Sequence, residues 1–426
     1  MAMSLPGTGR AGSPENGLPG VSPGGLPGTC RAGLPGAGLS GVSPGGLAGA
    51  EHHRTVLPGA ALLTRIELAV LPTPLVPAPR LAAAMGIDRL QVKRDDLTGF
   101  AFGGNKARPL EFLVAAAREQ GADTLVTGGA AGSNFCAATA AAARRAGLAC
   151  QLLIAGQPPQ HSPALDLACS WGATVSWTHA AERTSVDTGL PRAAAALAAA
   201  GRRPYLIPRG GATALGATGY ALAAVELHDQ LARRGLRTDC VLVAAGSGGT
   251  LAGLLAGTAL LGRPWRLVGA SVSRPPAEAA RRVLRLARDC LSLLAGPAAA
   301  GRDGTGREAA RRKATGRAAT GRAAPGRAAT GRAAPGRAAP GQHAAWPTIT
   351  VRDFDLVDAR GPGHGVASAD GDHAADTALR TEGLVADPVY TAKALAVLRT
   401  MTGERSAVFW HTGGLLDAIA AAGAQR

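Results

Sequence analysis

Short apolar runs recur along the chain, and each ends in or leads into a glycine-rich turn that an Ala-rich stretch usually follows. Such runs are typical of buried strands, and the longer stretches after them are typical of helices. We expect strands at residues 124–128, 151–156, 240–245, 266–272 and 407–414. Helices are expected from about Asn134, near Leu251–Leu261 and after Gly414. Strand, glycine turn and helix in this repeated order predict an α/β protein whose parallel sheets are covered on both faces.

Two segments lack this pattern. Residues 1–55 are dominated by Gly, Pro, Leu and Ser, and residues 301–345 contain repeats of GRAAT and GRAAP. Neither has apolar side chains at a regular spacing that would form a core, so both are predicted to be disordered. The second segment is either a surface insertion, whose loop-closure entropy grows slowly with length, or a basic tether for a polyanion.

The net charge of +16 points first to nucleic acid or an anionic surface as a partner. Ten Lys or Arg residues and two acidic residues lie between Gly301 and Gly341, so this segment carries half of the net charge. Aromatic residues make up 3% of the chain, which leaves few platforms for stacking on bases. The distribution of charge therefore argues against a nucleic-acid partner.

The six cysteines form no CxxC pair and no zinc-type grouping with histidine, so no metal site is predicted. They are interpreted as small buried residues of a protein in a reducing compartment. The N-terminus lacks a basic segment followed by an apolar run, and no window reaches the ~18 apolar residues of a membrane span. We expect a cytoplasmic protein with no membrane partner.

The strongest candidate for chemistry is the stretch KRDDLTGFAFGGNKARPLEFL, residues 93–113. Gly103 and Gly104 permit a tight turn, and Lys106 then lies at the head of a helix whose first residue is predicted to be Pro109. A partly desolvated lysine at the positive end of a helix dipole has a lowered pKa, which Schiff-base chemistry requires. The alternative is an exposed lysine in a turn, because short motifs have many false matches.

Two further glycine-rich turns are candidates for binding anions. AAGSGGTLAGL, residues 244–254, follows a strand and offers free amides and hydroxyls at a helix start, as a phosphate requires. GGAAGSN ends in Ser133 and Asn134 at another helix start, where both can hold a substrate carboxylate. The alternatives are a turn without a ligand and an ordinary N-cap. Tyr390 and His411 are two further candidates for the site. The alternative for Tyr390 is a tyrosine of the core, and the alternative for His411 is a polar group whose hydrogen bonds are satisfied.

Taken in order, these motifs resemble the family of pyridoxal-phosphate (PLP) enzymes that contains D-cysteine desulfhydrase and 1-aminocyclopropane-1-carboxylate deaminase. The resemblance covers nearly all of residues 60–420 and rests on PTPL, GGNK, GGAAGSN, IPRGGATALGATGY, SGGT, EGLVADPVY and HTGG. It implies the two-domain tryptophan-synthase-β-like fold (PLP fold type II), with parallel-rich sheets flanked by helices, and a homodimer. The large PLP-binding domain would comprise residues 56–109 and 213–426, and a small domain would comprise residues 110–212.

The resemblance also implies a role for each candidate residue. Lys106 becomes the Schiff-base lysine that moves the proton at the substrate α-carbon, and Tyr390 a catalytic neighbour of the reacting atoms. Ser133 contacts the substrate carboxylate or donates a proton, and Asn134 binds the 3′-oxygen of PLP. The implied cofactor-binding residues are Lys106, Asn134, Ser247, Gly248, Gly249, Thr250 and Thr391. The implied substrate-binding residues are Ser133, Asn134 and His364.

Three positions bear on the reaction that the resemblance implies. Ring-opening deaminases of the family have a glutamate where this chain has Thr391, the expected partner of the pyridine nitrogen. A hydroxyl leaves that nitrogen neutral, which suffices when a good leaving group departs from the β-carbon. Pro109 replaces a lysine near the phosphate and removes a charge-assisted contact. His364 replaces a tyrosine of the usual GPGYG and changes the wall around the substrate.

These implications favour a PLP-dependent lyase that removes the β-substituent of a small amino acid, with D-cysteine giving pyruvate, sulfide and ammonia as the leading hypothesis. One alternative is a 1-aminocyclopropane-1-carboxylate deaminase, or another PLP lyase or racemase. The other alternative is a PLP-binding or nucleic-acid-binding protein in which Pro109, Ala137 and His364 mark lost catalysis.

Overall fold

The structure is a computed structural model that describes residues 57–295, 346–401 and 403–424. The two segments predicted to be disordered, residues 1–55 and 301–345, lie outside the described residues. None of the helices in the described part of the chain has the length and apolar character that crossing a lipid bilayer requires.

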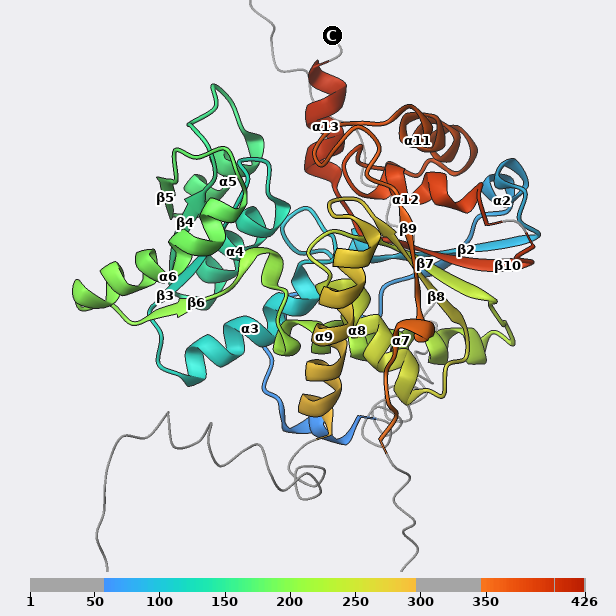
Figure 1. Cartoon of the computed structure of the whole chain (residues 1–426), viewed down its shortest axis with the longest axis horizontal. Helices are drawn as coiled ribbons and strands as arrows, with labels where there is room; N and C mark the ends of the chain where they lie inside the picture. The colour runs from blue at the N-terminus through green and yellow to red at the C-terminus, as the bar shows by residue number, and fades with distance from the viewer. Residues whose placement is uncertain (1–56, 296–345, 402, 425–426) are drawn as a thin grey trace, which may run out of the picture. The chain divides into compact units, whose positions relative to one another are not determined.

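Two sheets, each flanked by helices, organise the described residues (Figure 1). The larger sheet has the strand order β1-β2-β10-β7-β8-β9, in which β1 is antiparallel to β2 and every other neighbouring pair is parallel. Its strands are β1 (Leu75–Pro77), β2 (Arg89–Arg94), β7 (Cys240–Ala245), β8 (Arg266–Ser271), β9 (Asp355–Asp358) and β10 (Ser406–His411). The smaller sheet is parallel throughout, in the order β5-β4-β3-β6. Its strands are β3 (Thr124–Gly129), β4 (Ala149–Ile154), β5 (Ala173–Trp177) and β6 (Pro204–Leu206).

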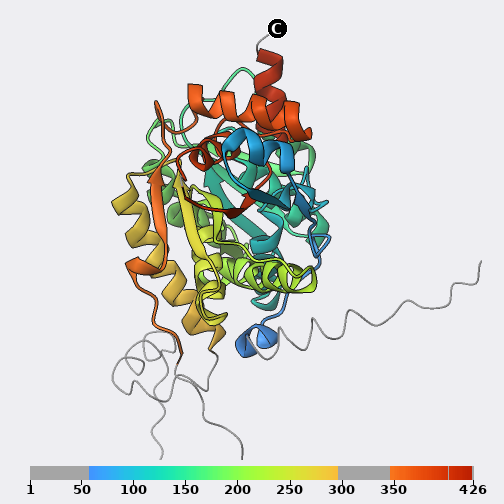
Figure 2. The same ribbon diagram turned by 90° about the vertical axis from the view of Figure 1, so that its right-hand side faces the viewer.

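Helices cover both faces of the larger sheet because successive strand residues point to opposite faces. In β7, Val241 and Val243 pack in a core with α7, α8 and α9, whereas Leu242 packs in a second core with α2, α11 and α12. Both views show α11 above this sheet and α7 below it (Figures 1 and 2). The bounds of these helices are α2 (Pro79–Met85), α7 (Ala214–Arg233), α8 (Gly249–Leu260), α9 (Pro276–Leu294), α11 (Ala369–Glu382) and α12 (Thr391–Leu398).

Helices also cover both faces of the smaller sheet. Leu125 of β3 belongs to a core that it shares with α3, α4 and α5, and the next residue, Val126, packs with Val186 and Leu190 of α6 on the opposite face. These helices are α3 (Ala107–Glu119), α4 (Asn134–Ala146), α5 (Pro163–Ser170) and α6 (Thr184–Ala199), and the last described helix is α13 (Leu415–Ala424). Short 3-10 helices are η1 (Pro58–Leu62), η2 (Asp95–Leu97), η3 (Arg209–Gly211) and η5 (Val351–Asp353).

The predicted α/β fold class and its strands are confirmed, with ends that shift by at most three residues. One helix start was predicted wrongly: α3 begins at Ala107, with Lys106 as its N-cap, and Pro109 is its third residue. Proline is tolerated there because the amides of the first helical turn have no intrahelical acceptor. The expected domain boundary between residues 109 and 110 falls inside α3, and the division into two domains stays a prediction.

A buried ionic network anchors α3 to the larger sheet. Arg108 donates to both carboxylate oxygens of Asp95, at 2.9 Å each, and to both carboxylate oxygens of Glu226, at 3.0 Å each. Lys93 of β2 also pairs with Glu226, and the Tyr220 hydroxyl donates to Asp95 at 2.6 Å. Because Arg108 follows Lys106 by two residues, this network holds the start of α3 in place.

Candidate active site

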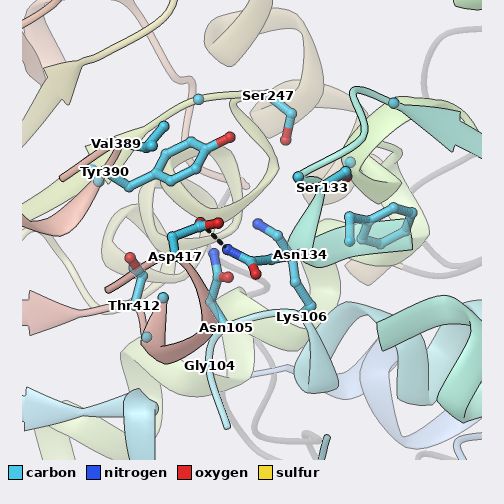
Figure 3. Close-up of a pocket in the computed structure, with 18 of the residues that line it drawn as sticks. Gly104, Asn105, Lys106, Ser133, Asn134, Ser247, Val389, Tyr390, Thr412 and Asp417 are labelled. Atoms are coloured by element: carbon cyan, nitrogen blue, oxygen red, sulfur yellow. Dashed lines mark hydrogen bonds between the residues drawn. The ribbon is translucent and has the colours of Figure 1, made fainter. Parts of the chain in front are cut away.

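A cavity of about 570 Å³ opens where β3, β7 and β10 reach their carboxyl ends. In open α/β sheets this edge is where ligands bind, because the loops after parallel strands meet there. Residues 130–134 follow β3, residues 246–250 follow β7 and residues 412–417 follow β10, and members of all three segments line the cavity. Figure 3 shows Lys106, Asn134, Ser247 and Tyr390 around the same space.

Lys106 is half-buried in the wall of this cavity. Burial lowers the pKa of its amine to about 8, although the nearby carboxylate of Asp387 acts in the opposite direction. Its side chain points into the cavity beside Asn134 (Figure 3). At pH 7 an amine with a pKa of about 8 is neutral in about a tenth of molecules, far more than for an ordinary lysine, which suits Lys106 to act as a nucleophile.

Two glycine turns bring the Lys106 segment against the loop after β10. Gly104 (φ 94°) and Gly413 (φ 93°) have left-handed backbone that L side chains rarely adopt. A Cβ on Gly413 would lie 2.5 Å from the Cα of Gly104, so the two backbone segments approach too closely for a side chain at Gly413. The Asn105 amide donates to the carbonyl of Thr412 at 2.9 Å and closes the contact. The position of Lys106 therefore depends on both GGNK and HTGG.

The turn after β7 has the features of an anion cradle. Gly248 is the N-cap of α8 with φ 93°, and no side chain caps the free amides of the first turn. Ser247, Gly248 and Thr250 line the cavity, and the side-chain amide of Asn105 donates to the Thr250 hydroxyl at 2.9 Å. Gly249 begins α8 but is not a lining residue. Free amides at the positive end of a helix are suited to a phosphate.

Ser133 and Asn134 lie together at the start of α4, and both line the cavity. Ser133 is the N-cap, and its hydroxyl accepts a hydrogen bond from the Cys136 amide at 3.3 Å, so the capping alternative holds for this residue. The Asn134 side chain donates to the Asp417 carboxylate at 2.7 Å, and Figure 3 marks this bond. Burial and the carboxylate of Asp387 raise the pKa of Asp417 to about 6.

Tyr390 and His364 form the opposite wall. Their rings are 5.8 Å apart in an edge-to-face arrangement, and both residues line the cavity. Burial raises the pKa of the Tyr390 hydroxyl to about 12. Burial and the positive charge of Arg183 lower the pKa of His364 to about 4, so its imidazole is neutral at pH 7. His411 is a satisfied polar group, since its ring contacts the carbonyl of Val385 at 2.8 Å.

Thr391 is fully buried behind the wall and is not among the lining residues. Its hydroxyl donates to the Asp387 carboxylate at 2.5 Å, and that carboxylate also accepts the amides of Val389, Tyr390 and Thr391. Asp387 itself lines the cavity, and burial raises its pKa. Thr391 therefore reaches the cavity only through Asp387.

Several lining residues were missed by the sequence analysis. Asp387 lies within the EGLVADPVY motif, where its place before a proline and a helix start was the available signal. Asp417 lies three residues after HTGG in the first turn of the last helix. Four arginines also line the cavity, but they are dispersed along the chain and no motif joins them: Arg183, Arg209, Arg274 and Arg282.

Asp417→Asn is expected to stabilise the protein at alkaline pH. Between about pH 4 and pH 6 the folded chain keeps a proton on Asp417 that the unfolded chain releases, so the cost of this carboxylate grows as pH rises through that window. The variant should gain up to about 3 kcal/mol at pH 8, at about 1.4 kcal/mol per pKa unit, and almost nothing at pH 4. Urea unfolding at both pH values measures the difference, with the exposed Glu119→Gln as the control. An equal gain at both pH values would refute the argument.

Comparison with known proteins gives concordant matches. The family model described as "Pyridoxal-phosphate dependent enzyme" matches residues 66–413. A D-cysteine desulfhydrase from Salmonella choleraesuis is 35% identical over 380 residues, which cover 85% of this chain and 96% of that protein. A putative 1-aminocyclopropane-1-carboxylate deaminase from Pyrococcus abyssi is 40% identical over 230 residues, which cover 54% of this chain and 69% of that protein. The crystal structure of an ACC deaminase homologue superposes with a TM-score of 0.69 at 28% identity, covering 86% of this chain and 96% of that one.

Proposed function

Since this chain belongs to the family of pyridoxal-phosphate-dependent enzymes, we propose that it removes the β-substituent of a small amino acid, with D-cysteine giving pyruvate, sulfide and ammonia. The predicted resemblance, the fold type and the cofactor are confirmed by the family match and by the relatives. The observation that carries the proposal is the lysine amine with a lowered pKa facing an uncapped, glycine-rich helix start across one cavity.

The cavity residues fit this cofactor. Lys106 offers an amine to which its aldehyde carbon can attach, and residues 247–250 offer amides and hydroxyls for its phosphate. A Cβ on Gly246 would lie 2.9 Å from the Tyr390 ring, so the turn leaves no room for a side chain there. Arg282 donates to the carbonyl of Ser247 at 2.8 Å, which brings a positive charge to the cradle where Pro109 has removed one.

When bound, the cofactor supplies an electron sink for the pair released at the substrate α-carbon. Lys106 holds it covalently and moves the proton at the α-carbon, a task for which a pKa of about 8 is suited. Asn134 and Ser133 orient the substrate carboxylate at the start of α4. Tyr390 excludes water and lines the reacting side, and Thr391 positions the Asp387 carboxylate.

Two observations support elimination rather than ring opening. The likeness to the desulfhydrase extends over 96% of that protein, against 69% for the deaminase. The family resemblance agrees, because it places Thr391 where the ring-opening members have a glutamate; in the structure the Thr391 hydroxyl lies behind the cavity wall and donates to Asp387. Ring opening, racemisation and binding without catalysis remain the alternatives that product analysis separates.

We propose that the protein is a cytoplasmic homodimer. The five cysteines that the structure describes are all free, as is typical of a reducing compartment. Dimerisation follows from the family resemblance. Light scattering on the purified protein measures the oligomeric state, and a monomer would contradict this part of the proposal.

The protein loaded with PLP is expected to convert D-cysteine to equal amounts of pyruvate, sulfide and ammonia. The assay quantifies all three products and uses L-cysteine and 1-aminocyclopropane-1-carboxylate as comparison substrates. Release of 2-oxobutyrate from the cyclopropane compound, with no sulfide from cysteine, would favour the deaminase alternative. A protein that binds PLP and leaves every amino acid unchanged would contradict the enzyme proposal.

A further inference from the structure

Four arginines line the cavity and are called the arginine cluster: Arg183, Arg209, Arg274 and Arg282. They reach the cavity from both sheets. Arg183 is the N-cap of α6 and Arg209 begins η3, both beside the smaller sheet. Arg274 follows β8 and Arg282 lies on α9, both beside the larger sheet. Four guanidinium groups around one cavity favour a negatively charged ligand.

Arg274 and Arg282 are already tied to the cradle. Arg274 donates to the carbonyl of Gly246 at 2.9 Å, and Arg282 donates to the carbonyl of Ser247 at 2.8 Å. Arg274 also pairs with the exposed Glu278 at 3.1 Å. Their positions match a role toward the cofactor phosphate, which leaves the other two arginines to be explained.

Arg183 and Arg209 are held differently. Arg209 forms a two-pronged ion pair with Asp187, at 2.9 and 2.5 Å. Arg183 is half-buried, and its guanidinium has no hydrogen bond or ion pair with any residue in the described ranges. Burial, followed by the charge of Arg209, lowers the pKa of Arg183, although Tyr390 and Asp187 act in the opposite direction. A partly desolvated cation without a partner is costly unless a ligand supplies the counter-charge.

Arg183 lines the same cavity as Tyr390, the proposed neighbour of the reacting atoms. Arg183 acts electrostatically on both Tyr390 and His364, the two rings of the opposite wall. The Nδ1 atom of His364 is buried and has no hydrogen-bond partner among the described residues. The loop of Arg209 touches the cradle, since a Cβ on Gly210 would lie 2.7 Å from the Ser247 side chain. An anion between Tyr390 and Arg183 would therefore meet one unpaired cation and one unused ring nitrogen.

We infer that Arg183, supported by Arg209 and His364, binds a negatively charged substituent on the substrate β-carbon. The preferred substrates are then amino acids with a sulfonate or a phosphate at that carbon. The inference rests on the proposed elimination and narrows its substrates to amino acids whose β-substituent is an anion. A cysteine thiol carries a negative charge only when it is ionised, whereas a sulfonate or a phosphate carries one at neutral pH.

The reaction balances without an oxidant or a reductant. The α-proton is removed, its electron pair forms the double bond between the α- and β-carbons, and the substituent leaves with the pair of its bond to the β-carbon. Sulfite or phosphate is released, and addition of one water then gives a keto acid and ammonium. Arginine suits both leaving groups because its planar guanidinium forms paired hydrogen bonds with such oxyanions.

A binding experiment tests the charge preference without turnover. The PLP-loaded protein is titrated with aspartate and with asparagine, which have nearly the same shape but differ in charge, and the visible absorbance reports binding. Arg183→Gln should weaken aspartate binding about 10- to 100-fold, as loss of a charged hydrogen bond does, and change asparagine binding less than about twofold. Arg183→Lys should keep part of the preference for aspartate over asparagine that Arg183→Gln loses. The exposed Arg192→Gln, on the same helix, is the matched control.

A kinetic experiment tests the substrate class. Keto-acid formation is compared for cysteate and O-phosphoserine, which carry anionic substituents, and for β-chloroalanine, which carries a neutral one, using both enantiomers of each. The inference expects higher kcat/KM for the anionic compounds and a selective loss of that advantage in Arg183→Gln, with the cofactor absorbance unchanged.

Three results would overturn the inference. If Arg183→Gln lowers turnover of all substrates equally, or weakens PLP uptake, Arg183 serves the cofactor or the fold. If the protein turns over β-chloroalanine and D-cysteine but neither anionic compound, the inference fails and the proposed elimination stands. If no substrate is turned over although PLP is bound, the proposed elimination fails and the inference falls with it.

Discussion

Lys106→Ala is expected to lose the visible absorbance of bound PLP and to slow keto-acid formation by about 100- to 10,000-fold. The lower bound is what one positioned proton-transfer group contributes, and loss of the covalent attachment adds to it. Both losses follow from the position of this amine, which is the lysine amine lining the cavity in the described part of the chain.

Two measurements assign the absorbance to this residue. Borohydride reduction of the wild-type protein, followed by peptide mapping, should place the mass of the cofactor on the peptide that contains Lys106. Lys393→Met is the control, because Lys393 is buried, donates to the carbonyls of Arg360 and Gly363, and does not line the cavity. A Lys106→Ala protein that keeps the band, or a cofactor mass on another lysine, would refute the assignment.

Arg108→Met should lower the free energy of unfolding by about 3–5 kcal/mol, the usual cost of removing one partner of a buried ion pair. Burial raises the pKa of Asp95, but Arg108 outweighs this effect and holds that pKa at about 2. Without the guanidinium, the carboxylates of Asp95 and Glu226 stay buried with Lys93 as their remaining cation. The start of α3 would also lose its tie to the larger sheet.

Urea unfolding followed by tryptophan fluorescence measures this loss, because the ring of Trp410 lies 5.9 Å from that of Tyr220 in the same network. Arg118→Met changes an exposed arginine on the same helix and should cost less than about 0.5 kcal/mol. Equal costs for the two variants would mean that the network does not stabilise the fold.

The amino-acid sequence by itself determined the fold class and most of the motif-bearing part of the site. The strands at residues 124–129 and 240–245 could be predicted because apolar runs between glycine turns are a local signal. The turns of GGNK, GSGGT and GGAAGSN, each of which leads into a helix, could be predicted because the glycines and the following helix lie within a few residues of one another. Lys106, Ser133, Asn134, Ser247 and Tyr390 accordingly line one cavity.

The tertiary structure alone decided which side chains face one another across that cavity. Asp417 meets Asn134 although 283 residues separate them, and the arginine cluster is drawn from four segments that lie far apart in the sequence. Thr391 turns away from the cavity because the Asp387 carboxylate accepts its hydroxyl. Periodicity indicates which face of an element is buried, but the opposing residue is chosen by long-range packing, which no local pattern encodes. The charge that distinguishes this cavity, and with it the proposed class of substrate, therefore emerged only when the two sheets were assembled.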